Sequence, residues 1–117
     1  MSGAVSYHSG LAAESAVAGQ YTAQGYEIAA RRWRSKAGEI DLIARKDGIV
    51  IFIEVKKSRS FDAAAGMLAA HQIARLYDSA SIFLEGEPKG QLSPARFDVA
   101  LVDGTGAISI LENALMA

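Results

Sequence analysis

Hydrophobic residues dominate two short runs near the middle of the chain, and the runs meet at Asp47 and Gly48. Runs of this length that are rich in Ile, Val and Phe are typical of β-strands. An Asp-Gly pair between two such runs is a strong signal for a two-residue hairpin turn. We therefore expect antiparallel strands over residues 39–46 and 49–57.

Helical spacing marks two other stretches. Residues 10 to about 24 are rich in alanine, and Gly25 follows as a residue that favours a helix C-terminus. Between residues 63 and 84, apolar side chains recur at the helical period and leave His71, Gln72 and Arg75 on the outer side. Residues 26–33 predict a first strand, residues 85–94 a loop, and residues 96–111 a last hairpin that turns at residues 104–106.

The predicted order is helix, three strands, helix and two strands. This order favours the α/β class, with a central mixed β-sheet flanked by helices. The long helix would cross the sheet and return the chain for the fourth strand. With 117 residues and neither repeat nor linker, we expect a single domain over residues 1–117, with residues 1–9 as a flexible N-terminus.

Composition narrows the class of protein. Half of the residues are hydrophobic and 21% are charged, as in ordinary soluble globular proteins. The absence of cysteine excludes disulfides and thiolate metal sites. The longest apolar run, residues 49–53, is too short to span a membrane, and the N-terminus lacks the pattern of a signal peptide. We expect a cytoplasmic protein.

Charge is unevenly distributed, although the net charge is only −1. Residues 31–59 hold nine of the twelve Lys and Arg residues against four acids, so this segment carries +5 and the rest of the chain −6. Such segregation gives either one electropositive face or a scattered set of solvated charges. Trp33, set among these cations, is either a stacking platform for bases or, more commonly, a core residue. The candidate nucleic-acid contacts are Arg31, Arg32, Arg34, Lys36, Lys57 and Arg59.

The hairpin register predicts which charged residues of the two central strands lie next to each other. With a two-residue turn at Asp47 and Gly48, Asp41 lies directly opposite Glu54, and Lys56 shares their face because side chains alternate along a strand. Two carboxylates at this separation repel each other. A bound divalent cation, the ammonium group of Lys56 or a raised pKa on one acid would relieve the repulsion. The reverse face is apolar and consists of Ile40, Leu42, Ala44, Ile51, Ile53 and Val55.

Of the three ways to relieve this repulsion, a bound divalent cation is the one that implies a function. Mg²⁺ prefers oxygen ligands and keeps several waters, so Asp41, Glu54 and a backbone carbonyl suit it. Such a site would support hydrolysis of a phosphodiester, with Lys56 stabilising the charge that develops on phosphorus. The structural alternative is a partly solvated ion pair between Glu54 and Lys56, with Asp41 hydrogen-bonded to the backbone.

Three further polar residues are candidates. Glu14 shares a helical stripe with Leu11 and Tyr21 and therefore points towards the sheet, either as a third acid at the metal or as a first-turn acid favoured by the helix dipole. Asp98 lies on a short apolar strand, where we favour a structural hydrogen-bond acceptor. His71 has no second His and no Cys to complete a metal site, so we expect it on the helix surface.

These residues and the chain around them resemble a known family. Asp41 and the triplet Glu54-Val55-Lys56 look like the PD-(D/E)xK nuclease signature, and the chain as a whole is similar to the YraN-like family of small bacterial proteins. The matching stretches run along almost the whole chain and are "YTAQGYEI", "RRWRSKAGEIDLIARKDG", "IVIFIEVKKSR", "RFDVALVD" and "ILENAL".

The resemblance implies a restriction-endonuclease-like fold, nucleic-acid binding and a metal-dependent phosphodiesterase activity akin to that of Holliday-junction resolvases. It makes Asp41 and Glu54 metal ligands, together with the carbonyl of Val55. It makes Lys56 the catalytic lysine and Glu14 the helix acid that completes such sites.

The chain departs from the family pattern at three places. Ile40 replaces a proline before Asp41, and Arg32 stands where an asparagine is usual. His71 or Gln72 falls where the long helix usually carries a lysine, which bears on substrate contact by that helix and leaves the acidic residues intact.

We expect a Mg²⁺-dependent nuclease, with Mn²⁺ as a substitute, that binds DNA rather than RNA and acts on branched or structured DNA. The first alternative is a non-catalytic nucleic-acid-binding module that keeps the fold. The second is a protein-interaction domain whose basic segment meets an acidic partner. A homodimer would let two sites cut two strands, although no exposed apolar stripe in the sequence demonstrates one, and we expect no membrane partner.

Overall fold

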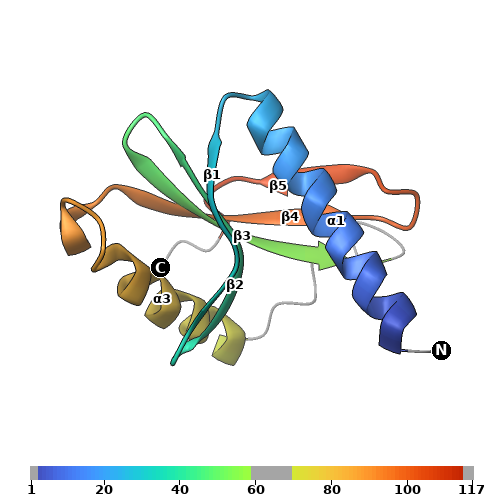
Figure 1. Ribbon diagram of the computed structural model, residues 1–117, viewed down its shortest axis with the longest axis horizontal. Helices are drawn as coiled ribbons and strands as arrows, with labels where there is room; N and C mark the ends of the chain where they lie inside the picture. Colours follow the sequence, from blue (N-terminus) through green and yellow to red (C-terminus); the bar gives the residue numbers. More distant parts are fainter. Residues whose placement is uncertain (1–2, 59–69, 115–117) are drawn as a thin grey trace.

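The structure is a computed structural model that describes residues 3–58 and 70–114 (Figure 1). Within these ranges the order of elements is helix, three strands, helix and two strands, with one turn of 3-10 helix before the fourth strand, which confirms the predicted order. The elements are α1 Gly3–Ala23, β1 Glu27–Ser35, β2 Gly38–Lys46, β3 Ile49–Lys57, α3 Ala70–Leu84, η1 Gly90–Leu92, β4 Ala95–Val102 and β5 Ile108–Leu111.

The strands form one mixed sheet in the order β1-β2-β3-β4-β5. Neighbouring strands are antiparallel except β3 and β4, which are parallel. A parallel pair needs a crossover connection, and α3 lies within that connection. Helix α1 packs on one face of the sheet and α3 on the other (Figure 1). The predicted mixed sheet flanked by helices is therefore confirmed.

Each face of the sheet has its own apolar core. On the α1 side, Val17, Ala18 and Tyr21 of the helix are buried against strand residues, because they recur at helical spacing on one side of α1. On the α3 side, Leu76, Ala80 and Leu84 do the same. Their strand partners are Leu42, Ala44, Ile51 and Ile53 on the α1 side and Ile40, Ile43, Val50 and Phe52 on the α3 side.

The hairpin register predicted from the Asp-Gly turn is confirmed. The β2–β3 ladder runs from the pair Lys46 and Ile49 to the pair Leu42 and Ile53. Asp47 and Gly48 both have positive φ angles, as a two-residue turn of this kind requires. The turn chemistry therefore determines which residues of β2 and β3 face each other.

The face predicted for Ile40 is wrong. Ile40 was expected beside Leu42 on the α1 side, but it packs with Ile43 on the α3 side. The backbone nearby is irregular, since Arg32 of β1 has φ 49°, and the β1–β2 ladder includes the pairs on both sides of Arg32 but not Arg32 itself. A local irregularity of this kind re-aims the side chains next to it.

Trp33 is a core residue rather than a stacking platform. Its ring packs against the α3-side core and meets Phe83 edge to face, with the ring centroids 5.4 Å apart. Trp33 pairs with Ile40 across β1 and β2, so both side chains lie on the α3 side. The commoner of the two interpretations made from the sequence is therefore confirmed.

One helix boundary differs from the sequence prediction, and a second is not tested. Helix α1 begins at Gly3 rather than near residue 10, and α3 begins at Ala70, while residues 63–69 of the predicted long helix lie outside the described residues. No helix within the described part of the chain is long and apolar enough to cross a membrane.

Candidate functional site

Asp41 and Glu54 lie at one end of β2 and β3, immediately beyond the last pair of the β2–β3 ladder. There a side chain takes the place of a main-chain acceptor: Asp41 Oδ2 accepts a hydrogen bond of 2.8 Å from the backbone N–H of Val55. The carboxylate of Asp41 is thus fixed against β3 beside Glu54. The structure brings these two acids together as the register predicted.

Burial and mutual repulsion change the titration of both acids. Glu54 is only 7% exposed, and its burial together with the charge of Asp41 raises its pKa to about 8, although Lys56 partly offsets the rise. Burial also raises the pKa of Asp41, while the hydrogen bond from Val55 opposes that rise. Without a metal ion, the pair therefore holds a proton at neutral pH.

The two oxygens of Glu54 have different surroundings. Oε1 lies 3.7 Å from Nζ of Lys56, whose side chain is 16% exposed. Oε2 is buried and accepts no hydrogen bond from any residue that the structure describes. A buried oxygen without a partner is unfavourable, so this atom requires either a proton or a cation.

Glu14 approaches this pair from α1. The charge of Asp41 contributes to raising the pKa of Glu14, after the larger effect of burial, which shows that the two carboxylates interact. The nearest cation to Glu14 is Arg32, with Nε 4.0 Å from Oε2. Within residues 3–58 and 70–114, no three acidic or His side chains lie close enough to hold a metal ion together. The structure therefore groups Asp41 with Glu54 and leaves Glu14 beside Arg32.

Arg32 joins the acids around the site. Its Nε lies 3.6 Å from Glu39 as well as 4.0 Å from Glu14, and Arg34 donates a hydrogen bond of 2.9 Å to the other oxygen of Glu39. The positive φ of Arg32 is a conformation that asparagine adopts more readily than other residues with a side chain.

A cleft of about 280 Å³ opens beside the two acids. Asp41 and Glu54 line one side of it, and Gln72 and Arg75 of α3 line the other. The helical spacing predicted Arg75 on the outer side of the helix, and Arg75 was not among the predicted site residues. The available signal was its position three residues after Gln72, which puts both side chains on the same face of α3. The full lining is Gly38, Glu39, Asp41, Glu54, Gln72, Arg75 and Leu76.

The tip of the β1–β2 hairpin forms a fixed wall of this cleft. Ser35 Oγ and Ser79 Oγ of α3 are hydrogen-bonded at 3.3 Å. Gly38 has φ 150°, and a Cβ at this position would lie 3.4 Å from Ser79 Oγ and 3.8 Å from Arg75 Cβ. These are ordinary contact distances, so it is the φ of residue 38, which glycine adopts without strain, that favours glycine at the hairpin tip.

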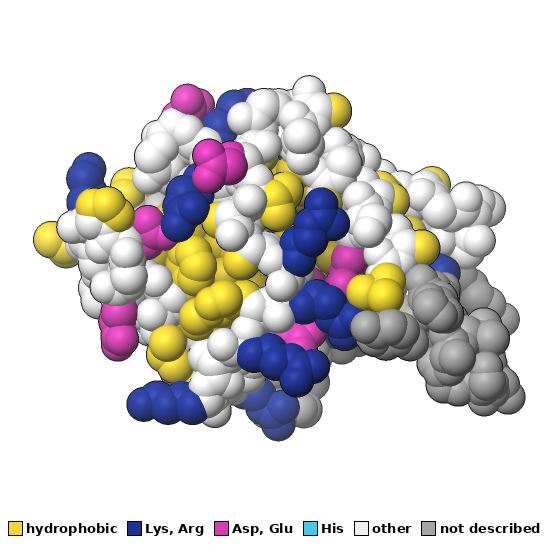
Figure 2. All heavy atoms as spheres, in the orientation of Figure 1, with side chains coloured by type: hydrophobic (Ala, Val, Ile, Leu, Met, Phe, Trp, Pro, Cys, Tyr) yellow, Lys and Arg dark blue, Asp and Glu magenta, His cyan; other side chains and the backbone are white. Residues whose placement is uncertain are grey.

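The predicted nucleic-acid contacts do not all lie on one face. Arg31, Arg34, Lys36 and Lys57 are exposed, and Arg59 lies outside the described residues. Lys57 points away from the face of Lys56, because side chains alternate along β3. Figure 2 shows Lys and Arg side chains gathered around Asp and Glu side chains at the lower centre of the face in view.

His71 falls at the start of α3, where the structure does not describe its side chain. Its expected place on the helix surface stays a prediction.

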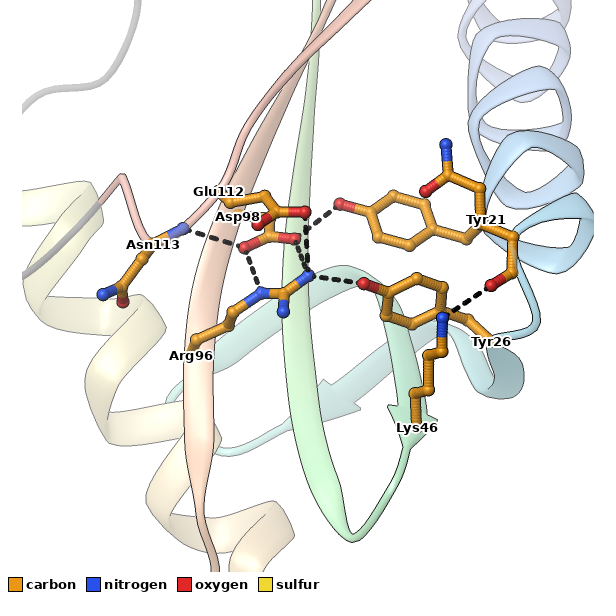
Figure 3. Close-up of polar contacts among 8 residues, drawn as sticks. Tyr21, Tyr26, Lys46, Arg96, Asp98, Glu112 and Asn113 are labelled. Carbon is orange, nitrogen blue, oxygen red and sulfur yellow. Dashed lines mark hydrogen bonds and ion pairs between the residues drawn. The ribbon is translucent and has the colours of Figure 1, made fainter.

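Asp98 has the structural role that the sequence favoured (Figure 3). It is fully buried and accepts hydrogen bonds from the Tyr21 hydroxyl at 2.8 Å, from the Arg96 guanidinium at 2.9 and 3.1 Å, and from the backbone N–H of Asn113 at 3.0 Å. Arg96 also donates to the hydroxyl of Tyr26. These bonds tie α1, β4 and the segment after β5 together and use the oxygens of Asp98 for structure.

Comparison with known proteins agrees with the family resemblance. The profile described as Uncharacterised protein family UPF0102 matches residues 13–102. A UPF0102 protein of Cereibacter sphaeroides strain KD131 is 60% identical over 117 residues and covers all of both chains. UPF0102 proteins of Roseobacter denitrificans and Dinoroseobacter shibae are 50% and 39% identical, covering 97% and 92% of this chain and 88% and 81% of their own lengths. The chain therefore belongs to the UPF0102 family.

Proposed function

We propose that this protein is a Mg²⁺-dependent nuclease that hydrolyses phosphodiester bonds in DNA. The observation that carries the proposal is the juxtaposition of Asp41 and Glu54, two buried carboxylates beside an open cleft, with one Glu54 oxygen lacking a hydrogen-bond partner among the described residues. A cation between the two acids would remove their repulsion and satisfy that oxygen. The resemblance to the PD-(D/E)xK signature supports the same assignment.

The donor set fits a small, hard cation. Mg²⁺ and Mn²⁺ take oxygen ligands, and Asp41 and Glu54 together with the carbonyl of Val55 would hold such an ion, with water completing its shell. Glu14, which lies beside Arg32, would influence the site through its charge and not as a ligand of the ion. When bound, the ion supplies polarisation of a phosphate oxygen and lowers the pKa of water.

Lys56 and Arg75 would act on the substrate. The ammonium group of Lys56 lies beside Glu54 in the metal-free protein, and it becomes available to a phosphate once a cation neutralises the carboxylate. There it would stabilise the negative charge that builds up on phosphorus during hydrolysis. Arg75 faces the acids across the cleft, where its guanidinium suits a neighbouring phosphate.

The exposed cations around the cleft would contact the nucleic-acid backbone without reading sequence. Arg31 and Arg34 lie on β1 and Lys36 follows at the tip of its hairpin, and Arg34 contacts Glu39 of the cleft lining. The resemblance to Holliday-junction resolvases favours branched or structured DNA as substrate.

A cleavage assay tests this function. Linear, flapped and four-way DNA are incubated with Mg²⁺ or Mn²⁺ and the wild-type protein, Asp41→Asn or Glu54→Gln. We expect cleavage by the wild type and its loss in both variants, since each removes a charged ligand. Cleavage that survives in both variants would show that the assigned acids are not the catalytic site.

A second candidate is a nucleic-acid-binding module without catalysis. The observation in its favour is the contact of Glu54 with Lys56, which lets the site neutralise its own charge without a metal ion. This candidate predicts salt-dependent DNA binding that weakens when Arg34 or Lys36 is neutralised, with no cleavage under any metal condition.

A further inference from the structure

A second hollow lies at the opposite end of β2 and β3 from Asp41 and Glu54. It has a volume of about 520 Å³ and opens between the turn at Asp47 and Gly48 and the loop that connects α3 to β4. Its apolar walls come from Val50, Pro88 and Pro94. The charged residues around it are Glu27, Arg45, Lys46, Asp47, Glu87 and Lys89.

Most of these charges are already satisfied. Arg45 donates to Glu87 through Nε at 3.1 Å and also through Nη2, and its Nη1 lies 3.8 Å from Glu27. Lys46 donates a hydrogen bond of 2.7 Å to the backbone carbonyl of Gln24. The hollow therefore offers an apolar floor between paired charges, which suits an apolar side chain better than an ionic ligand.

An exposed leucine stands beside this hollow. Leu92 of η1 is 86% exposed, and among the described residues Leu111, at 43%, is the other exposed large hydrophobic side chain. The loop that carries Leu92 is well ordered by hydrogen bonds: Leu92 N–H donates to Lys89 at 3.0 Å, and the Gln91 side chain donates to the carbonyl of Ser81 at 2.8 Å. In Figure 1 this loop is the orange segment at the left tip of the molecule. Leu92 is thus presented to solvent in a preorganised position.

Two opposite charges on the rim of the hollow have no ion-pair partner. Lys89 and Asp47 both line it, and in the described part of the chain neither forms a salt bridge. The loop next to Leu92 thus carries an unpaired cation, and the turn on the far wall carries an unpaired anion.

We infer that this patch is an interface between two copies of the chain. Leu92 of each protomer enters the hollow of the other, and Lys89 faces the partner's Asp47. The same patch carries the projecting leucine and the hollow that receives it, and it carries both the cation and the anion. A two-fold interface requires a patch that is self-complementary in this way. The contact lies far from Asp41 and Glu54, so both acidic sites stay open in the dimer.

The dimer is expected to be weak. Each protomer contributes one large apolar side chain and one charge pair, as in small, reversible interfaces. Association will therefore depend on protein concentration, and the inference stands apart from the proposed nuclease function.

Sedimentation velocity over a concentration series tests the interface. We expect wild-type protein to shift from monomer to dimer as its concentration rises, and Leu92→Glu to remain a monomer throughout. Leu111→Glu is the matched control, since it places the same charge on the other exposed leucine, and it should dimerise like the wild type. Wild-type protein that stays monomeric, or Leu92→Glu that dimerises like the wild type, would overturn the inference.

A charge variant tests the orientation of the two protomers. Lys89→Glu places two acids face to face and should weaken dimerisation, with the loss reduced at high salt. Thermal unfolding of each variant, followed by circular dichroism, checks that the fold is unchanged, as expected for exposed positions. Lys89→Glu that dimerises as tightly as the wild type would contradict the proposed pairing with the partner's Asp47.

Discussion

Glu54 is the residue of the site with the least favourable electrostatic surroundings. It is buried, faces a second acid, has one cation nearby and retains one oxygen without a hydrogen-bond partner in the described structure. A pKa of about 8 means that Glu54 keeps its proton in the folded, metal-free protein at a pH where the unfolded chain has lost it. Folding and proton binding are therefore linked at this residue.

This linkage predicts how stability depends on pH. Because the folded pKa lies above the ordinary glutamate pKa of 4.5, the unfolding free energy of metal-free protein should fall by a few kcal/mol as pH rises from about 5 to about 8. Glu54→Gln cannot ionise and should flatten this dependence. Urea denaturation at a series of pH values measures both slopes, and equal slopes for the wild type and the variant would contradict the assignment.

Arg75 is the cation that the structure adds to the site. Arg75→Ala should weaken DNA binding and reduce the salt slope by about 1, as for the loss of one phosphate contact, without changing affinity for Mn²⁺. Lys89→Ala, at the far end of the sheet, is the matched control, and at concentrations where the protein is monomeric it should bind DNA like the wild type. Fluorescence anisotropy with labelled DNA at several salt concentrations gives these slopes. An unchanged slope in Arg75→Ala would remove Arg75 from the DNA contacts.

At the level of elements, the β1–β2 hairpin and α3 together define the cleft. Gly38 lies at the tip of this hairpin with a φ of 150°, a conformation that residues with a side chain rarely adopt. Gly38→Ala should destabilise the protein by about 1–2 kcal/mol, because alanine is strained at this φ. Gly19→Ala, on an open surface of α1, is the control and should be neutral or stabilising. Chemical denaturation compares the two, and equal stabilities would argue against this strain.

Sequence patterns predicted the elements that depend on local chemistry. The Asp47-Gly48 turn determines the β2–β3 register, so the juxtaposition of Asp41 and Glu54 followed from counting residues. The face of Ile40 did not follow, because the positive φ of Arg32 has no signal in the hydrophobic pattern.

The cleft was equally hidden from the sequence. Helical spacing shows which residues share a stripe, but it does not show how close a neighbouring hairpin lies. The contact of the β1–β2 hairpin with Ser79 brings Arg75 to the acids, and this contact belongs to tertiary packing.

At the scale of the whole molecule, the two faces of the sheet carry different polar groups. The α3 face carries Glu54 and the cleft, whereas the α1 face carries the network of Asp98, which ties α1 and the C-terminal segment to β4. Burial raises the pKa of the Tyr21 hydroxyl, so it stays protonated and donates to Asp98. The charge of Asp98 is thus compensated within the network, and Asp98 serves the structure of the fold.

Asp98→Asn should therefore destabilise the whole fold. The change removes the buried charged partner of Arg96 and leaves it only the exposed Glu112, 3.5 Å from Nη2, so we expect a loss of about 3 kcal/mol. Tyr21→Phe removes one hydrogen bond to the same carboxylate and should lose about 1.5 kcal/mol. Thermal and urea denaturation measure both losses, and a stable Asp98→Asn protein would show that the network is not the main tie between α1 and β4.

The central claim is that Asp41 and Glu54 hold a divalent cation. Calorimetric titration of Mn²⁺ into the protein tests it without a substrate, and Asp41→Asn is the informative variant because its amide oxygen can still accept the hydrogen bond from Val55. We predict one site in the wild type, at least tenfold weaker binding in Asp41→Asn, about 1.4 kcal/mol or more, and unchanged binding in the control Glu112→Gln. Wild-type protein that binds no Mn²⁺, or Asp41→Asn that binds it equally well, would contradict the account.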